Sequence, residues 1–136
     1  MKKALVLGAG GFIGSHMVNR LRAEGYWVRG IDLKESKFYK STAHEFIRAD
    51  LSKYQSMHSA IRIRVNDKLE SFDEIYQFAA DMGGAGYIFT GENDSNIMSN
   101  SVLINVNLLN AQKQLNNLNV QFPLTRQPKI MKSPLN

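Results

Sequence analysis

The segment LGAGGFIGSH, residues 7 to 16, places four glycines and an alanine between apolar residues and then continues into a polar stretch. Three interpretations fit such a segment: a phosphate-binding turn between a strand and a helix, the apolar centre of a secretory signal, or a remnant of cloning. The last arises because Gly14-Ser15-His16-Met17 is a common junction sequence. The residues that follow the glycines discriminate between the three.

The stretch after the glycines has the pattern of an amphipathic helix. Its apolar residues recur at helical spacing and form one stripe, Ile13, Met17, Val18 and Leu21. Gly25 then supplies a stop signal for the helix. A signal peptide would end in a small-residue cleavage site, and a cloning remnant would not share the periodicity of a helix. We therefore predict a strand, a glycine turn and a helix, and we expect a cytoplasmic protein.

Gly8, Gly11 and Gly14 give the pattern G-x-x-G-x-x-G. In a dinucleotide site, such glycines permit a tight turn, let the backbone approach the pyrophosphate and allow the helix to pack closely on the strand. Asp32 ends the next apolar segment, 18 residues after Gly14. An acidic residue at about this distance binds a ribose 2′-hydroxyl, and its charge repels a 2′-phosphate. A helix-capping or turn aspartate is the alternative, and the nearby Lys34 and Lys37 leave some tolerance for NADP open.

The chain alternates predicted strands and helices up to about residue 111. Strand-like segments lie at residues 4–8, 26–32, 45–50 and 74–80, and a helical stretch covers about 52–63. This order predicts an α/β fold, a Rossmann-type doubly wound parallel sheet with strand order 3-2-1-4 and helices on both faces. Asp50, Ala79 and Ala80 would then lie at the carboxyl edge of the sheet, where such folds bind ligands.

Composition excludes several other classes of function. The chain has no cysteine, and no apolar run approaches the ~20 residues that a membrane span requires. The formal charge is +5, but the excess lies in scattered basic residues after Asn110, which does not predict a nucleic-acid surface. The three histidines have no metal-ligand spacing. We therefore expect no metal, no membrane and no nucleic acid.

Taken together, Gly8-Ala9-Gly10-Gly11-Phe12-Ile13-Gly14, Asp32, Asp50-Leu51 and Ala79-Ala80 resemble the extended short-chain dehydrogenase/reductase family, the NAD-dependent epimerases and dehydratases. The stretch Ala79-Ala80-Asp81-Met82-Gly83-Gly84 is similar to one in the GDP-mannose 3,5-epimerases of that family. The resemblance covers residues 3 to about 111, with extra length around residues 61–72.

The resemblance implies NAD as cofactor and a sugar nucleotide such as GDP-mannose as substrate. It assigns the pyrophosphate to residues 8–14, which include Phe12 and Ile13, and the adenosine ribose to Asp32. The remaining implied roles are adenine contact for Asp50 and Leu51, nicotinamide contact for Ala79 and Ala80, sugar-nucleotide contact for Gly83, and a place near the cofactor for Asn100. Two alternatives stay open: Asn100 is one polar residue on an asparagine-rich helix, and the glycines after Met82 form a simple mobile loop.

The chain departs from this family in its catalytic residues. The family uses a Tyr-x-x-x-Lys pair, in which the lysine lowers the pKa of the tyrosine so that it can transfer a proton. None of the five tyrosines here has a lysine four residues later. We therefore assign no catalytic residue and expect no independent catalysis.

The second departure is the end of the sequence. We expect residues 1–111 to form a partial NAD-binding domain and residues 112–136 an irregular tail, with NVQF as the one strand-like segment. The tail reads as out-of-frame coding or as a disordered extension. We accordingly expect a truncated epimerase; the alternatives are a subunit completed by another chain and a non-catalytic nucleotide-binding module. An open sheet edge in such a chain would favour self-association.

Overall fold

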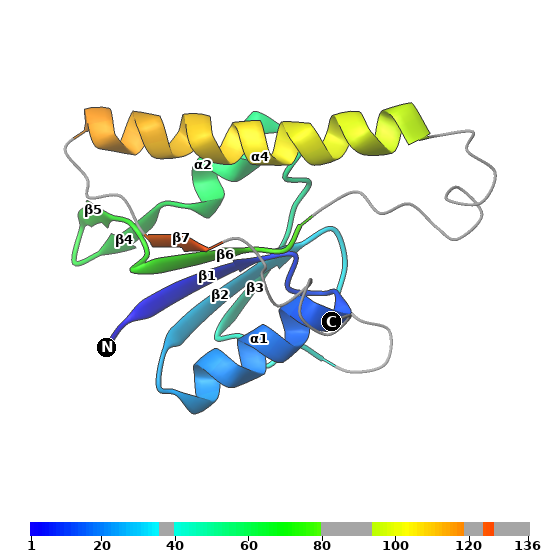
Figure 1. The fold of residues 1–136 in the computed structure, drawn as a ribbon. Coiled ribbons are helices and arrows are strands. Elements are labelled where there is room, and N and C mark those ends of the chain that lie inside the picture. The colour runs from blue at the N-terminus through cyan, green and yellow to red at the C-terminus, as the bar shows by residue number, and fades with distance from the viewer. Residues whose placement is uncertain (36–39, 80–93, 119–123, 127–136) are drawn as a thin grey trace.

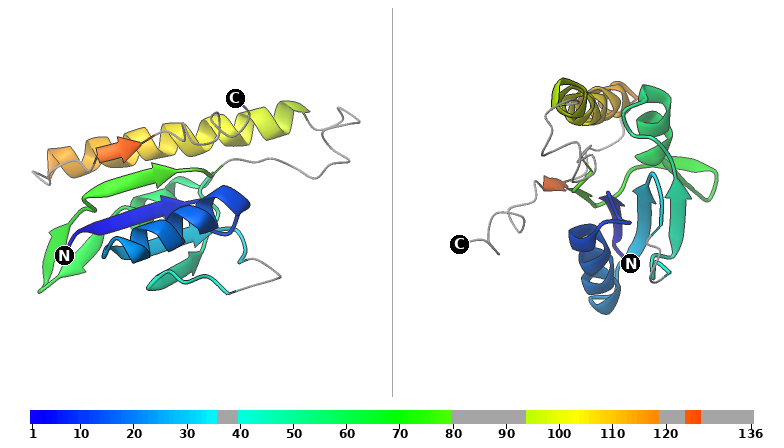
Figure 2. Two further views of the ribbon diagram at one scale, coloured as in Figure 1. Left: turned by 60° about the horizontal axis from the view of Figure 1, so that its bottom comes forward. Right: turned by 90° about the vertical axis from the view of Figure 1, so that its right-hand side faces the viewer.

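The computed structural model describes residues 1–35, 40–79, 94–118 and 124–126, with the side chains of all but 94–99 and 124–126. Its main feature is a five-stranded sheet in which every pair of neighbouring strands is parallel. The strands lie in the order β3 (Glu45–Arg48), β2 (Trp27–Asp32), β1 (Lys3–Leu7), β6 (Glu74–Gln77) and β7 (Leu124–Arg126). Helices α2 (Tyr54–Ala60) and α4 (Asp94–Asn117) cover one face of this sheet and α1 (Phe12–Ala23) covers the other (Figures 1 and 2). The predicted doubly wound fold and the strand order 3-2-1-4 are confirmed, with β6 as the fourth strand.

The first β-α-β unit follows the sequence pattern closely. Strand β1 (Lys3–Leu7) leads through the glycine turn into α1 (Phe12–Ala23), and β2 (Trp27–Asp32) follows. Val18 and Leu21 of the predicted apolar stripe are buried against the sheet. The helix stops before Gly25, whose φ of +89° is a conformation that favours glycine.

The segment from residue 45 to residue 70 differs from the expected strand and helix. Strand β3 (Glu45–Arg48) pairs with β2, but α2 is short (Tyr54–Ala60), and an antiparallel hairpin of β4 (Ile63–Val65) and β5 (Lys68–Glu70) follows. Asn66 and Asp67 make the hairpin turn with φ values of +53° and +62°. Two successive residues at positive φ match the twist of a hairpin, and Asn and Asp tolerate this conformation better than most residues. The extra length in this region therefore forms a separate two-stranded sheet.

A buried arginine ties the end of α2 to the main sheet. The Arg29 guanidinium donates hydrogen bonds to the carbonyl oxygens of Ala60 and Arg62, at 2.9 and 2.8 Å. It also pairs with Glu45 and lies 5.0 Å from the centroid of the Phe72 ring. A strand residue thus satisfies carbonyl groups at the end of the helix that would otherwise lack partners.

The chain beyond residue 111 also differs from the expected irregular tail. After β6 (Glu74–Gln77), helix α4 (Asp94–Asn117) continues because Ala111 and Leu115, one turn apart, are fully buried. Strand β7 (Leu124–Arg126) then adds to the sheet beside β6. The strand-like NVQF segment lies outside the described residues. Whether residues 112–136 form a unit separate from the NAD-binding domain stays a prediction.

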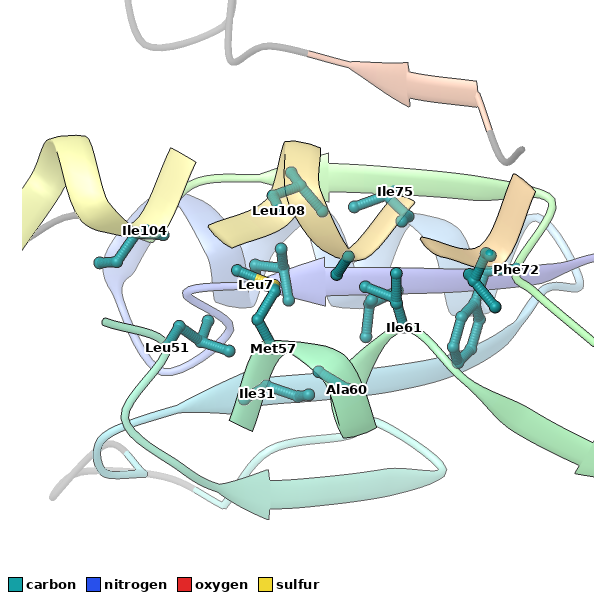
Figure 3. Packing of buried hydrophobic residues seen from close by; sticks show 13 residues of the cluster. Leu7, Ile31, Leu51, Met57, Ala60, Ile61, Phe72, Ile75, Ile104 and Leu108 are labelled. Atoms are coloured by element: carbon teal, nitrogen blue, oxygen red, sulfur yellow. The ribbon is translucent and has the colours of Figure 1, made fainter. Parts of the chain in front are cut away.

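The strands alternate their side chains between two apolar layers. Leu5 and Leu7 pack toward α2 and α4, whereas Ala4 and Val6 pack toward α1. Figure 3 shows the larger layer, which includes residues of the sheet and of both helices: Leu7, Ile31, Ile75, Met57, Ile104 and Leu108. None of the helices in the described ranges combines the length and hydropathy needed to cross a membrane.

Candidate functional site

The glycine turn is held in place by backbone contacts that leave no room for side chains. Gly8 has a φ of +88°, and a Cβ there would lie 2.7 Å from the Ala79 nitrogen. A Cβ on Gly14 would lie 2.0 Å from the Gly8 carbonyl oxygen, and one on Gly10 would lie 2.2 Å from the Lys34 carbonyl oxygen. These approaches bring the start of α1 directly above the end of β1.

Gly11 differs from the other glycines of the turn. It is the N-cap of α1 with a φ of −81°, and the nearest atom to its Cβ position is the Gly8 carbonyl oxygen at 3.6 Å. Among the described residues no side chain caps this helix end, and its first turn carries no acidic residue. The backbone N–H groups of Phe12 and Ile13 therefore present a partial positive charge without a competing carboxylate on the helix, whereas the Gly11 N–H donates to the Gly8 carbonyl oxygen at 3.3 Å.

Asp32 joins the glycine turn to the end of β2. Its Oδ2 accepts a hydrogen bond from the Gly10 N–H at 2.8 Å, and its Oδ1 accepts one from the Leu33 N–H at 2.7 Å. Both carboxylate oxygens retain further acceptor capacity. The carboxylate thus has a defined orientation at the rim of the turn and can still accept hydrogen bonds from a ligand.

The turn after β3 forms the opposite wall. Asp50 Oδ1 accepts hydrogen bonds from the Ser52 N–H at 3.0 Å and the Ser52 hydroxyl at 2.6 Å. The Leu51 side chain is buried, and its carbonyl oxygen accepts a 3.0 Å hydrogen bond from Asn107 of α4. Asn107 is itself 5% exposed. Helix α4 therefore fixes a segment 56 residues away in the sequence.

These segments enclose a cleft of about 360 Å³ at the carboxyl edge of the sheet. The candidate residues that line it are Gly8, Gly11, Asp32, Asp50, Leu51, Ala79 and Asn100. Phe12, Ile13 and Gly14 lie directly beside it in the first turn of α1, and the Phe12 side chain is 75% exposed. Ala80 and Gly83 lie outside the described residues. The structure thus gathers the described candidates in one place, and their binding of NAD stays a prediction.

Sequence reasoning missed Ser52, Gln77, Ile104 and Asn107. Ser52 and Ile104 line the cleft, whereas Gln77 and Asn107 are buried polar residues behind its walls. A signal exists for two of them: Gln77 interrupts the apolar run of residues 75–80, and Asn107 interrupts the apolar stripe of α4.

The site has no perturbed histidine. Burial, and then the charge of Arg22, lowers the pKa of His44, and burial followed by Arg62 lowers that of His58. Neither residue lines the cleft. Within the described ranges no group of three His, Asp or Glu side chains is arranged to hold a metal ion.

Comparisons with known proteins agree with this geometry. The model of the NAD dependent epimerase/dehydratase family matches residues 4–125. A GDP-mannose 3,5-epimerase from Oryza sativa subsp. indica is 36% identical over 110 residues, which are 79% of this chain and 26% of the relative. The chain therefore spans about a quarter of the length of that relative.

Two solved structures share the fold. A UDP-glucose 4-epimerase superposes with a TM-score of 0.66 at 22% identity, over 85% of this chain and 33% of the other. The UDP-glucose 4-epimerase of Thermus thermophilus, solved as a complex with NAD, gives 0.59 at 27% identity, over 84% and 34%. With its glycine turn, its parallel sheet and the family match over most of its length, this chain belongs to the NAD-dependent epimerase/dehydratase family.

Proposed function

We propose that this chain binds NAD in the cleft and is the cofactor-binding portion of a sugar-nucleotide epimerase resembling GDP-mannose 3,5-epimerase. One observation carries the proposal: the Asp32 carboxylate is hydrogen-bonded to the Gly10 N–H, so the acidic group and the glycine turn form a single rim of one cleft. A dinucleotide needs both of these features, for its ribose and for its pyrophosphate.

The residues present fit the parts of NAD. The N–H groups at the start of α1 suit the pyrophosphate, since Gly11 has no side chain where a phosphate would approach the backbone. The oriented Asp32 suits the ribose hydroxyls, which can donate to its oxygens. The buried Leu51 and Ile104 offer apolar surface for the adenine. Ala79 and Asn100, at the end of β6 and on α4, are the candidates for the nicotinamide half.

NAD supplies a hydride acceptor, and in this family the sugar oxidation that it permits makes neighbouring C–H bonds acidic. This sequence contains no Tyr-x-x-x-Lys pair that would take the proton. General acid–base groups contribute about 10²–10⁴-fold each. We therefore propose a cofactor-binding chain without independent epimerase activity, with Gly83 as the candidate contact to the sugar nucleotide.

A second candidate is a subunit that works with another polypeptide. Among the side chains of α4 that the structure describes, four large aliphatic ones are exposed, Val102, Leu103, Val106 and Leu109, and residues 95–112 contain no charged residue. Exposed apolar groups at helical spacing are typical of an interface rather than of a solvated helix face. Sedimentation analysis tests this candidate where the other polypeptide is a second copy of this chain: a monomer at all concentrations would contradict it.

Calorimetric titration of the chain with NAD and NADP tests the principal proposal. We expect NAD to bind and NADP to bind more weakly, because the Asp32 carboxylate repels a 2′-phosphate. Asp32→Asn should weaken NAD by roughly tenfold to a hundredfold, the effect of losing hydrogen bonds to a charged group, and should narrow the preference over NADP.

Asp73→Asn is the matched control. Asp73 also accepts a hydrogen bond from a backbone N–H, that of Lys3, but it lies at the opposite edge of the sheet. The Asp73→Asn variant should therefore bind NAD with wild-type affinity. Absence of NAD binding would reject the proposal, and NADP binding as tight as NAD would reject the role of Asp32.

A further inference from the structure

The two central strands part where they reach the cleft. The Phe78 N–H still donates to the Leu7 carbonyl oxygen at 2.8 Å, which continues the pairing of β6 with β1. One residue later β1 has ended, and the Gly8 and Ala9 N–H groups donate instead to the Ile31 carbonyl of β2, at 2.7 and 3.1 Å. Ala79 therefore faces the glycine turn after the regular ladder between β1 and β6 has stopped.

The side chain of Gln77 takes the place of a strand partner for Ala79. Its Oε1 accepts a hydrogen bond from the Ala79 N–H at 2.9 Å, and its Nε2 donates to the Ala79 carbonyl oxygen at 3.1 Å. One carboxamide thus satisfies both backbone groups of a single residue, as a neighbouring strand does in an antiparallel pair. Gln77 is 3% exposed, so water does not replace these bonds at low cost.

A third hydrogen bond connects this pairing to α4. Gln77 Nε2 also donates to Asn105 Oδ1 at 3.0 Å. The Gln77 carboxamide is therefore bound to Asn105 of α4 and, at the same time, to the backbone of Ala79. Ala79 in turn lies against the glycine turn, since a Cβ on Gly8 would be 2.7 Å from the Ala79 nitrogen. A shift of Ala79 would therefore change the width of the cleft at Gly8.

We propose that Gln77 is a positioning residue for dinucleotide binding: its carboxamide holds the backbone of Ala79 at the distance from Gly8 that the bound cofactor requires. This inference rests on the proposed function, because it concerns the same cleft. Gln77 does not line that cleft and acts through Ala79.

The surroundings of Gln77 contain few ionisable groups. On the elements packed around it, the charged side chains that the structure describes are Lys3 of β1, Glu74 of β6 and Lys113 of α4. Lys3 and Glu74 are the first residues of β1 and β6, whereas Gln77 is the last residue of β6. Lys113 is more than two helical turns from Asn105. None of the three has a hydrogen bond to Gln77 among those described.

Replacement of Gln77 by glutamate separates the hydrogen-bonding role from simple packing. Ionised, the new side chain places a carboxylate oxygen against the Ala79 carbonyl and loses the donor. Protonated, its hydroxyl donates to that carbonyl while its other oxygen accepts from the Ala79 N–H, which restores the pair. Burial disfavours the charged form and raises the pKa of such a carboxyl group.

We therefore expect NAD affinity of Gln77→Glu, relative to the wild type at the same pH, to be weaker by about tenfold at about pH 8.5 and by about threefold at about pH 5.5, where the protonated carboxyl restores the Ala79 pair but has no second hydrogen for Asn105. Gln77→Leu has no donor in either state, so it should bind weakly at both pH values. Relative to the wild type at the same pH, amide hydrogen exchange at Ala79 should be faster in Gln77→Leu at both pH values. In Gln77→Glu it should be faster only at the higher pH.

Asn105→Ala is the second variant, chosen because Asn105 is exposed and its loss should leave the fold intact. It removes the helix acceptor and should weaken NAD by roughly threefold, the effect of one ordinary hydrogen bond. Wild-type affinity in folded Gln77→Leu, or a pH-independent Gln77→Glu, would overturn the proposal. If the wild type itself binds no NAD, the proposed function fails. Unchanged hydrogen exchange at Ala79 in the Gln77 variants would separately contradict the pairing of the Gln77 carboxamide with the Ala79 backbone.

Discussion

A methyl group added to Gly8 would meet the backbone of the neighbouring strand. Its Cβ would lie 2.7 Å from both the Ala79 nitrogen and the Phe78 carbonyl carbon, and 2.9 Å from the Ala79 Cα. All three are backbone atoms just beyond the end of β6, where the Gln77 carboxamide holds the Ala79 backbone, so the clash cannot be relieved by rotation of a side chain. The φ of +88° is also unfavourable for alanine.

The expected loss of stability follows from these two effects. Positive φ costs an L-residue roughly 1–2 kcal/mol, and an extra methyl group in a closely packed site costs about 1–3 kcal/mol. The lower chain entropy of alanine in the unfolded state offsets about 0.4–1 kcal/mol. We therefore expect Gly8→Ala to lower the free energy of unfolding by about 3 kcal/mol.

Gly11→Ala is the matched control in the same turn. Its φ of −81° suits alanine, and the added Cβ has its nearest contact at 3.6 Å. It should cost less than about 1 kcal/mol, mainly because alanine is a poor N-cap, yet its methyl group stands where the pyrophosphate would approach and should weaken NAD binding. Urea unfolding and NAD titration of both variants measure the two effects.

Two results would refute this reasoning. Wild-type stability of Gly8→Ala would show that the turn can shift away from β6. Wild-type NAD affinity of a folded Gly11→Ala would show that the cofactor does not approach the backbone at this glycine.

Three further predictions concern the core, pH and turnover. Phe72→Ala should destabilise the protein by about 3–5 kcal/mol in urea unfolding, because the ring is 1% exposed and stacks on Trp27; a loss below about 1 kcal/mol would contradict its place in the core. The lowered pKa of His44 means that the folded protein favours the neutral ring, whose Nδ1 accepts from the Val28 N–H at 3.0 Å. This contribution should be fully present above about pH 6.5 and lost as the pH falls through the folded pKa, so His44→Gln should flatten the acid side of the stability profile. GDP-mannose incubated with the chain and saturating NAD in D₂O should take up no deuterium at C3 or C5 by NMR; deuterium uptake would reveal a base that the sequence does not announce.

Local patterns in the sequence were enough to predict the centre of the fold. The glycine spacing, the stripe in α1 and the short apolar segments each reflect a periodicity of 3.6 or 2, which is a property of neighbouring residues. The order of the parallel strands follows from the handedness and shortness of their connections. The candidate residues at the carboxyl ends of β1, β2, β3 and β6 could be predicted for the same reason, because parallel strands end at one edge of the sheet.

Where the chain departs from its strongest patterns, tertiary contacts decided the outcome. The hairpin after α2 depends on a turn at Asn66 and Asp67, whose tolerance of positive φ permits a hairpin turn but is shared by many other loops. Helix α4 continues past residue 111 because Leu115 reaches the core, and the short β7 exists because β6 offers it an edge. The core that Leu115 contacts and the edge of β6 that β7 pairs with are both formed by residues far away in the sequence, so neighbouring residues do not predict them.

The sequence by itself therefore determined the strand-turn-helix unit, the acidic residue after β2 and the doubly wound order, since these are encoded in local spacing. Only the tertiary structure decided that Asp32 is oriented by Gly10, that Asn107 holds Leu51 from 56 residues away, and that Gln77 pairs with the backbone of Ala79. Hydrogen bonds between buried polar groups follow no sequence period. They form wherever the packed layers bring a donor and an acceptor together out of reach of water.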